Sequence, residues 1–466
     1  TLIDGTNNSL TLTTVESVVG GSGNDTITVT DGSLTSGDLG DGNDRISLGA
    51  ATTATIDGGL GSDTLTGSDQ GDTLRLTGFE TVTAGIGNDD ITITDNLGAD
   101  IDLGLGDDTL TLEKGGAFGN GTLDGGSGTD VVNVYVNENL TGDSDLDLNN
   151  NFSGIERVNL VDQSETDNGH DIQIVLASTF NNGNAIIFDA STSFDAITSP
   201  NGNTNGLDVG ESLIFDASAY GQSSVSGSYA DDEISVVGGA GNDTITTAEL
   251  DIQRGLMTVD VSSGGIDTVV IANDDWNGEG LNTTSANADE TITNSSDWDD
   301  VIGSLSHGVE IFGFNGGQAG DKLDVQYGDG TSTTGGIQEG YVLGTGNPIN
   351  KASGTVIELD SSDYTISLDG TSFTLRDIAF DLSAGGQGDA LIDLDDGNYT
   401  VAIYSSQNTE TADTYLFNIR VDGGDGLDFT ISAANGTNPQ ADNDMIEYVG
   451  VFRGVGADVL VGENFI

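Results

Sequence analysis

A short glycine-rich repeat is the feature that most constrains how this chain folds. Residues Gly20-Gly21-Ser22-Gly23-Asn24-Asp25-Thr26-Ile27-Thr28 follow the pattern G-G-x-G-x-D-x-U-x, in which U is apolar. The pattern recurs, with some glycines replaced, at residues 39–47, 58–66, 84–92, 103–111, 125–133 and 238–246, and a shortened copy is Gly264-Gly265-Ile266-Asp267. A repeat of this kind predicts a stack of similar coils, that is, a solenoid.

Each residue type in the repeat has a physical reason. Glycine lets the backbone turn sharply and bring carbonyl oxygens together. The aspartate adds an anionic oxygen, and the apolar residue two positions later starts a short strand and points inward. Calcium takes about six to eight oxygen ligands, more than one such turn offers, so neighbouring turns must share each ion. One copy alone is explained as well by an ordinary surface turn, but repeated copies with Asp at the same position favour a ladder of calcium sites.

We therefore predict that the chain binds multiple Ca²⁺ ions and that the glycine, asparagine and aspartate positions of the repeat supply the ligands. The predicted metal ligands are Gly21, Gly23, Asn24, Asp25, Asp41, Asn43, Asp44, Gly59, Gly61, Asp63, Asn88, Asp89, Asp107, Asp108, Gly126, Gly128, Asp130, Gly239, Gly241, Asn242 and Asp243.

The spacing of the aspartates predicts how the coils are arranged. Asp25, Asp44 and Asp63 are 19 residues apart, and so are Asp89 and Asp108. A step of about two nonapeptides indicates one motif per coil, with a degenerate second half. The calcium ladder should then lie mainly on one side of the solenoid, with ordinary turns on the other. The gap of 26 residues between the third and fourth aspartates predicts an insertion around residues 71–79.

The charge of the chain also favours bound cations. Lys and Arg number 10 and Asp and Glu number 77, so the formal net charge is −67. Such a charge opposes a compact state unless cations neutralise it. Because 35% of the residues are hydrophobic and occur in short alternating runs, we favour a folded chain with bound cations over a disordered one. The same charge argues against nucleic-acid partners and anionic membranes.

The composition further limits the class of protein. The chain has no Cys, which excludes disulfides and thiolate metal sites. No stretch approaches the roughly 18 to 20 apolar residues that a membrane helix needs. With 71 Gly and 3 Pro, the chain should have many tight turns and few long helices. These features predict an all-β fold.

The repeats and the composition divide the chain into four predicted parts. Residues 1–140 form the repeat-rich β-solenoid, 141–235 an irregular β-rich extension and 236–275 a second short repeat segment. Residues 276–466 form an aromatic, β-sandwich-like domain that caps the solenoid, because an open solenoid end exposes sheet edges. A second signature, an acidic residue within an apolar strand, occurs as Val15-Glu16-Ser17-Val18, Phe79-Glu80-Thr81-Val82 and Ile155-Glu156-Arg157-Val158.

The sequence gives no sign of a catalytic centre. His-Glu-x-x-His and G-x-S-x-G motifs are absent, and His170 and His307 each stand alone in polar stretches. Asp pairs such as Asp89-Asp90 are expected in a chain this acidic, or as calcium ligands. We predict that the chain is not an enzyme.

The nonapeptides, the Glu-containing strands and the segment Leu213-Ile214-Phe215-Asp216-Ala217-Ser218 resemble RTX-type bacterial surface-layer proteins and large RTX adhesins. Residues 312–325 and the tail 458–466 resemble the closing β-roll and C-terminus of type I secreted proteins. The resemblance implies a right-handed parallel β-roll with stacked calcium sites, a type I secretion signal at the C-terminus, and folding outside the cell, where calcium is available. Some motifs depart from the pattern at glycine positions, as at Leu39 and Ala84.

On this basis we expect an extracellular, cell-surface structural protein that assembles with copies of itself into a layer or filament. The alternative is a calcium-dependent adhesin that binds a glycan or surface ligand, with Trp276 and Trp298 in the binding groove. A third hypothesis is the RTX carrier half of an enzyme whose catalytic domain precedes Thr1.

Overall fold

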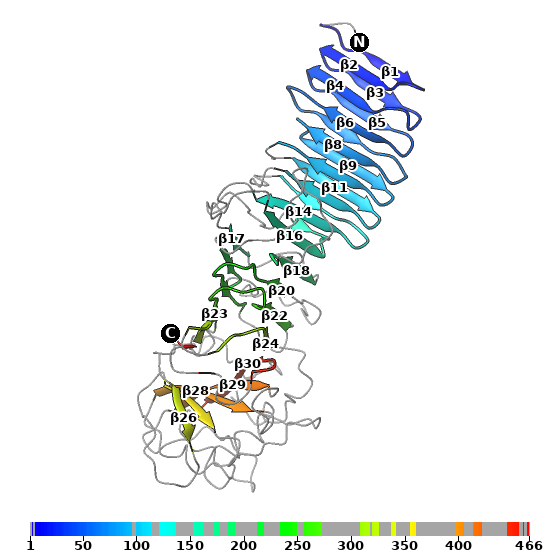
Figure 1. Ribbon diagram of the computed structural model, residues 1–466. Coiled ribbons are helices and arrows are strands. Elements are labelled where there is room, and N and C mark those ends of the chain that lie inside the picture. The colour runs from blue at the N-terminus through cyan, green and yellow to red at the C-terminus, as the bar shows by residue number, and fades with distance from the viewer. Residues whose placement is uncertain are drawn as a thin grey trace, which may run out of the picture. The chain divides into compact units, whose positions relative to one another are not determined.

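The computed structural model describes residues 2, 5–95, 99–113, 121–136, 152–162, 172–176, 185–191, 212–218, 234–248, 256–272, 308–316, 319–325, 337–341, 355–359, 397–404, 413–421, 445–455, 460 and 464–465. These residues contain 30 β-strands and no α-helix, which confirms the all-β prediction (Figure 1). His170, His307, Trp276, Trp298 and most of the tail 458–466 lie outside the described residues.

The chain divides into two compact units. The first comprises residues 1–215 with 239–241, and the second comprises residues 216–238 with 242–466. The predicted boundaries at residues 140, 235 and 275 stay predictions.

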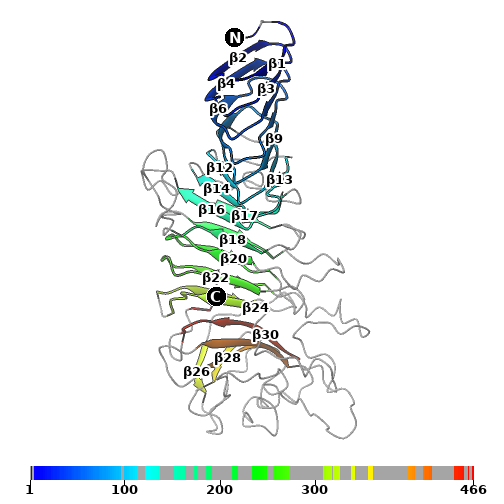
Figure 2. The ribbon, with the colours of Figure 1, turned by 90° about the vertical axis from the view of Figure 1, so that its right-hand side faces the viewer.

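Strands of the first unit alternate between two parallel sheets (Figures 1 and 2). Sheet A contains β1 (Ser9–Leu12), β3 (Thr26–Val29), β5 (Arg45–Leu48), β7 (Thr64–Thr66), β9 (Thr81–Ile86), β11 (Asp100–Leu105), β13 (Leu123–Asp124) and β15 (Phe152–Ser153). Sheet B contains β2 (Ser17–Ser22), β4 (Ser36–Asp41), β6 (Thr53–Asp57), β8 (Thr73–Thr77), β10 (Asp90–Ile93), β12 (Thr109–Leu112), β14 (Val131–Val136), β16 (Arg157–Asp162) and β18 (Ile186–Asp189). The unit also includes β17 (Ile172–Val175), and β19 (Leu213–Asp216) crosses the boundary.

Each coil therefore consists of one strand of sheet A, one strand of sheet B and the two turns that join them. The connection that leads from sheet B into sheet A is called the B-to-A turn, and the other the A-to-B turn. Long parallel sheets in this alternating order are compatible with the predicted β-roll.

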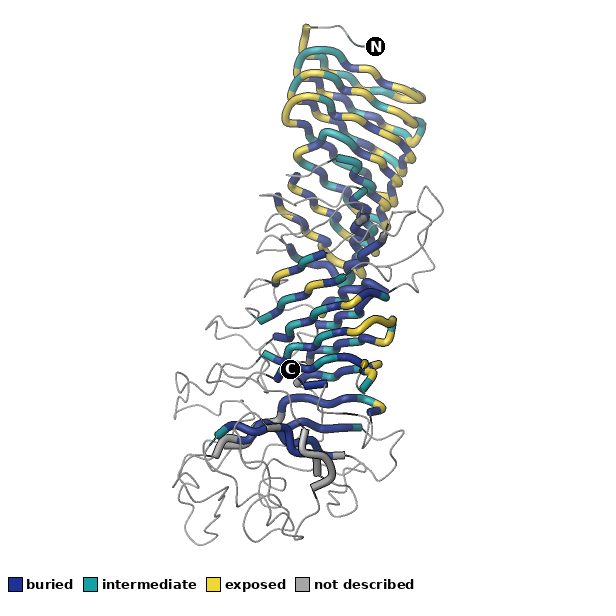
Figure 3. The backbone as a smooth tube through the Cα atoms, turned by 60° about the vertical axis from the view of Figure 1, so that its left-hand side comes forward, coloured by how far each residue is buried: buried dark blue, intermediate teal, exposed yellow. Residues whose placement is uncertain are grey.

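The core lies between the two sheets. Ile27, Ile46, Leu65 and Val82 stack in register on the inner face of sheet A, and each is fully buried. Their neighbours along the strand point outward, because successive side chains of a strand alternate between its faces, and the tube in Figure 3 shows this alternation of burial. The prediction that the apolar residue of each motif points inward is confirmed.

The second unit begins with parallel strands and then changes pattern. Its parallel pairs join β20 (Ile234–Val237) to β22 (Leu256–Asp260) and β24 (Gly308–Phe312), and β21 (Thr244–Thr246) to β23 (Thr268–Ile271) and β25 (Lys322–Val325). β30 (Met445–Phe452) pairs with β24 in parallel but with β29 (Thr414–Val421) antiparallel, and β29 pairs antiparallel with β28 (Gly397–Tyr404). β27 (Thr355–Leu359) lies parallel to β28 and to β26 (Ile337–Tyr341).

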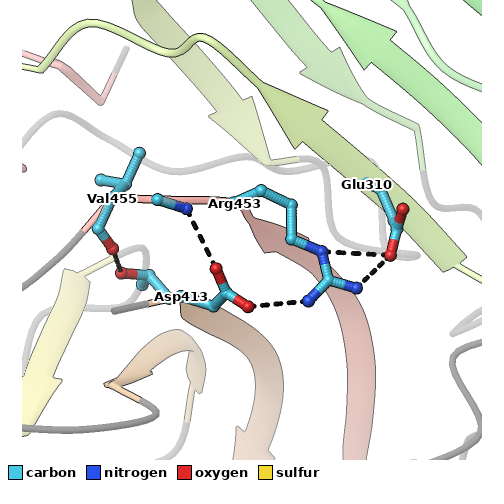
Figure 4. A network of polar contacts seen from close by, with 6 residues as sticks. Glu310, Asp413, Arg453 and Val455 are labelled. Carbon is cyan, nitrogen blue, oxygen red and sulfur yellow. Dashed lines mark hydrogen bonds and ion pairs between the residues drawn. The ribbon is translucent and has the colours of Figure 1, made fainter. Parts of the chain in front are cut away.

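An arginine stands where this change occurs. Arg453 follows β30 and pairs with Glu310 of β24 and with Asp413, which precedes β29 (Figure 4). The Arg453 Nη1 atom lies 2.8 Å from Asp413 Oδ2, and the backbone N–H of Gly454 donates to Asp413 Oδ1 at 3.0 Å. One cation thus joins the last parallel strand of the stack to the antiparallel strands.

The C-terminal residues also return to the stack. Phe465 forms a parallel bridge with Leu323 of β25, and the Asn464 side chain donates to the carbonyl of Asp321 at 2.7 Å. Segments more than a hundred residues apart in sequence therefore lie side by side in the second unit.

Candidate metal centre

The aspartates of the repeat lie in two different turns of the first unit. Those of the first three motifs, Asp25, Asp44 and Asp63, directly precede β3, β5 and β7 and so occupy the B-to-A turn. Those of the next three, Asp89, Asp108 and Asp130, directly precede β10, β12 and β14 and occupy the A-to-B turn. The expectation of aspartates mainly on one side is therefore wrong. We call the two sets the first and second ladders.

Asp72 explains the change of side. It lies nine residues after Asp63, in the A-to-B turn before β8, and is 1% exposed. Its backbone N–H donates to Asp89 Oδ1 at 2.6 Å, so Asp72 is the first member of the second ladder. The gap of 26 residues between Asp63 and Asp89 is thus one half-coil of 9 and one coil of 17, and the predicted insertion around residues 71–79 is wrong, because β8 pairs with both β6 and β10.

Each ladder is connected by hydrogen bonds between backbone and carboxylate. The N–H of Asp25 donates to Asp44 Oδ1, and that of Asp44 donates to Asp63 Oδ1, both at 2.7 Å. In the second ladder Asp89 donates to Asp108 at 2.7 Å and Asp108 donates to Asp130 at 2.9 Å. One oxygen of each carboxylate therefore accepts a hydrogen bond from the preceding coil.

The second oxygen of these carboxylates is left without a hydrogen bond. Among the described residues, Oδ2 of Asp44, Asp63, Asp89, Asp108 and Asp130 is buried and has no donor, and each of these residues is at most 2% exposed. Burial raises the pKa of Asp63 to about 6 and that of Asp89 and Asp130 to about 7. A buried carboxylate without a partner is costly unless a proton or a cation compensates it.

These oxygens fit a hard cation. Ca²⁺ prefers carboxylate and backbone carbonyl oxygens, and the ladder turns offer both. Asp44, Asp63, Asp89, Asp108 and Asp130 would hold the ion through Oδ2, while the ion would supply the positive charge that these buried oxygens lack.

The motif needs glycine at its stacked positions because a side chain would not fit there. A Cβ atom on Gly61 would lie 1.6 Å from the carbonyl oxygen of Gly42 in the preceding coil, and one on Gly59 would lie 1.9 Å from that of Gly40. In the coil before, a Cβ atom on Gly42 would meet the carbonyl of Gly23, and one on Gly40 would meet that of Gly21. In the second ladder, Gly126 and Gly128 meet the carbonyls of Gly104 and Gly106 in the same way. The predicted glycine ligands thus place successive carbonyl oxygens along both ladder turns.

The residues before the aspartates form a separate, exposed ladder. Asn24 Oδ1 accepts the N–H of Asn43 at 3.0 Å, and Asn43 Oδ1 accepts the N–H of Ser62 at 3.1 Å. Asn88 and Asp107 accept in the same way from the next coil, at 3.1 and 2.9 Å. These side chains bond to the following coil, whereas the buried aspartates bond to the preceding one. Asp41 lies exposed at the end of β4.

A third ladder lies in the second unit. The N–H of Asp243 donates to Asp267 Oδ1 at 2.9 Å, and that of Asp267 donates to Asp321 Oδ1 at 3.0 Å. Oδ2 of Asp267 is buried without a donor among the described residues, and burial raises its pKa to about 7. Asn242 Oδ1 accepts the N–H of Ile266 at 2.8 Å. Gly239 and Gly241 are buried and belong to the first unit.

Sequence reasoning missed several members of these ladders. Asp72, Asp267 and Asp321 were not among the predicted ligands, although Gly71-Asp72-Thr73-Leu74 and Gly320-Asp321-Lys322-Leu323 keep the end of the motif. Glu80 and Glu156 were also missed. Each accepts the N–H of the last aspartate of a ladder, Asp63 and Asp130 respectively, at 2.6 Å.

Side chains alone do not complete an ion site. In the described part of the chain, no three His, Cys, Asp or Glu side chains gather closely enough to hold a metal ion, so backbone carbonyls would have to contribute.

Within the described residues, no helix is long and apolar enough to cross a membrane. No protein-family model matches this chain, and no curated protein or solved structure is significantly similar to it.

Proposed function

We propose that this chain is a secreted, calcium-dependent structural protein, whose parallel β-roll is right-handed and folds when Ca²⁺ enters its aspartate ladders. The observation that carries the proposal is the series of buried aspartate oxygens without hydrogen-bond donors, repeated coil after coil beside stacked glycine carbonyls. An isolated buried anion is strongly disfavoured. A series of buried carboxylates is therefore stabilised best by a series of cations.

Folding and calcium binding would be coupled. The ladder turns exist only when the coils are stacked, so an ion that binds the folded chain alone contributes its binding free energy to folding. The resemblance of the repeats to RTX proteins supports the same view, because such chains fold after export. We place the protein at the cell surface on this ground.

The charge supports assembly with copies of the same chain. Subunits of net charge −67 repel one another, so a layer or filament requires cations between them. Calcium would then act twice, within each subunit and between subunits. No catalytic role is proposed.

Circular dichroism and analytical ultracentrifugation test the proposal together, with Ca²⁺ added back after EGTA treatment and Mg²⁺ as the control ion. We expect β-structure to form with calcium and large ordered assemblies to follow at higher calcium. A chain that folds with calcium but stays monomeric would favour the adhesin alternative, and a glycan screen would follow. A chain that keeps its β-structure in EGTA at neutral pH would contradict the calcium ladder.

Two variants separate the effect of losing a ladder carboxylate from the effect of a change in net charge. Asp108→Asn removes a buried ladder carboxylate, whereas Asp38→Asn removes an exposed one on the outer face of β4. We expect the first to raise the calcium concentration needed for folding by at least about tenfold, because a direct carboxylate ligand is lost, and the second to leave it nearly unchanged. Equal effects would indicate that only net charge matters.

A further inference from the structure

Both ladders of the first unit end at the same five-residue pattern. The first ladder is followed by Gly78-Phe79-Glu80-Thr81-Val82, and the second by Gly154-Ile155-Glu156-Arg157-Val158. Gly78 and Gly154 have positive φ angles of 67° and 65°, and Phe79 and Ile155 are buried. The coil after each ladder therefore replaces the glycine-rich turn by a turn closed with an apolar side chain.

The glutamate of this pattern takes the place of the next aspartate. Glu80 Oε2 accepts the N–H of Asp63 at 2.6 Å, in the way that Asp63 Oδ1 accepts the N–H of Asp44. Glu156 Oε2 accepts the N–H of Asp130 at the same distance. The two ends lie in opposite turns of the coil, so the arrangement has arisen at two separate places in the unit.

The last nonapeptide of each ladder is altered to match. Ser62 and Thr129 stand where earlier motifs have Asn or Asp, and the coil that follows has no glycine-rich turn whose N–H an Asn could accept. An aspartate precedes both motifs, as Asp38 and Asp102 precede the motifs one coil earlier. Here it accepts from the turn: Asp57 Oδ1 accepts the N–H of Gly59 at 3.0 Å, and Asp124 Oδ1 that of Gly126 at 3.2 Å. The ends of the ladders are thus defined structures and not a gradual loss of the repeat.

The final aspartates nevertheless keep the same unsatisfied oxygen as the interior ones. Asp63 is 1% exposed and Asp130 is 0% exposed, and in the described residues neither Oδ2 has a hydrogen-bond donor. If the glutamates served only to accept an N–H, these last oxygens would remain uncompensated.

We propose that Asp63 with Glu80, and Asp130 with Glu156, form a terminal Ca²⁺ site at the end of each ladder. The aspartate supplies Oδ2, the glutamate supplies a second carboxylate from a coil without the nonapeptide, and backbone carbonyls of the last glycine-rich turn complete the set. The inference rests on the proposed function, since it adds sites to ladders that are themselves proposed to bind calcium.

The number of bound ions tests the inference, measured on the whole chain at neutral pH by isothermal titration calorimetry and equilibrium dialysis with Ca²⁺. We expect Glu80→Gln and Glu156→Gln each to lose about one ion per chain, and the double variant about two, because a neutral amide is a poor substitute for a carboxylate ligand. Glu16→Gln is the matched control. Glu16 has a similar sequence context, Val15-Glu16-Ser17-Val18, and is exposed as Glu80 is, but it comes before the first ladder aspartate and so follows none of them.

The outcomes separate this inference from the proposed function. A wild-type chain that binds no calcium overturns both. A wild-type chain that binds calcium, with the same number of ions in Glu80→Gln and Glu156→Gln as in Glu16→Gln, overturns the terminal sites alone. If a Gln variant does not regain β-structure in saturating calcium, the count is made on Glu80→Asp, which keeps the charge but reaches less far. A full complement of ions at wild-type affinity in that variant also contradicts the terminal site.

Discussion

The two units differ in the sequence range of the contacts that stabilise each of them. In the first unit, ladder partners such as Asp44 and Asp63 lie 19 residues apart, and each ladder hydrogen bond joins adjacent coils. In the second unit, the ion pair of Arg453 with Glu310 spans 143 residues. Stability in the first unit is thus a sum of nearly equivalent steps, whereas the end of the second unit depends on a few long-range contacts. Substitutions in the two units should therefore act differently.

The largest effect should come from pH in the calcium-free chain, because all three ladders respond together. Burial raises the pKa of Asp63 to about 6 and of Asp89, Asp130 and Asp267 to about 7, above the value of about 3.9 for an exposed aspartate. The folded state then binds more protons than the unfolded state between about pH 4 and pH 7. Stability is therefore highest near pH 4 and is lost as the pH rises through about 7.

Thermal unfolding of the EGTA-treated chain, followed by circular dichroism between pH 4 and 8, measures this effect. Saturating calcium at neutral pH should restore the melting temperature, since the ion replaces the proton. A calcium-free chain that becomes more stable from pH 4 to pH 8 would contradict the buried ladders.

A side chain in the glycine stack should break the first unit locally. Gly61→Ala places a Cβ atom 1.6 Å from the Gly42 carbonyl oxygen, and the coils must separate to accept it, at a cost of about 3 kcal/mol or more in the free energy of unfolding. Gly5→Ala is the control: its φ is also positive, at 73°, but no atom lies within 4 Å of the added carbon, so it should cost only about 1 kcal/mol. Calcium-dependent denaturant unfolding compares the two variants, and equal losses would indicate backbone strain without stacking.

Loss of the long-range ion pair should act on the second unit alone. Arg453→Ala leaves Glu310 and Asp413 without their shared cation. Because the arginine side chain is 22% exposed, we expect a loss of about 2 kcal/mol, less than for a fully buried pair. Hydrogen exchange read by mass spectrometry should show faster exchange in β24, β29 and β30, with β3 to β12 unchanged. Faster exchange throughout both units would show that the first unit also depends on this contact.

The smallest effect is expected for an exposed ion pair of the first unit. Arg75 of β8 pairs with Glu113, which follows β12, and the arginine side chain is 45% exposed. Arg75→Ala should change the free energy of unfolding by about 0.5 kcal/mol, as is usual for solvent-exposed pairs. A loss as large as that in Arg453→Ala, measured by the same denaturant unfolding, would remove the contrast between the two units.

Much of the fold could be predicted from the sequence because the same strand-and-turn pattern recurs in every copy of the repeat. The alternation of apolar residues gave the inward-facing core of Ile27, Ile46 and Leu65, and the motif aspartates were identified one by one. The side on which each aspartate lies was not accessible. Asp72 stands in a motif without the full glycine pattern, so the half-coil step was mistaken for an insertion. The sequence shows Glu80 and Glu156 as part of a strand signature. That they accept the N–H groups of Asp63 and Asp130 depends on which residues face each other in adjacent coils.

The sequence by itself determined the kind of structure: short parallel strands, tight glycine turns and aspartates at fixed positions, because these follow from local backbone geometry and from the two-residue period of a strand. Only the tertiary structure decided that the two ladders of the first unit occupy opposite turns, that each of these two ends at a glutamate, and that β30 and Phe465 return to the parallel strands. The reason is physical. Register between coils is set by hydrogen bonds and packing between residues that are distant in sequence, and a half-coil step exchanges the two sides while leaving every local pattern intact.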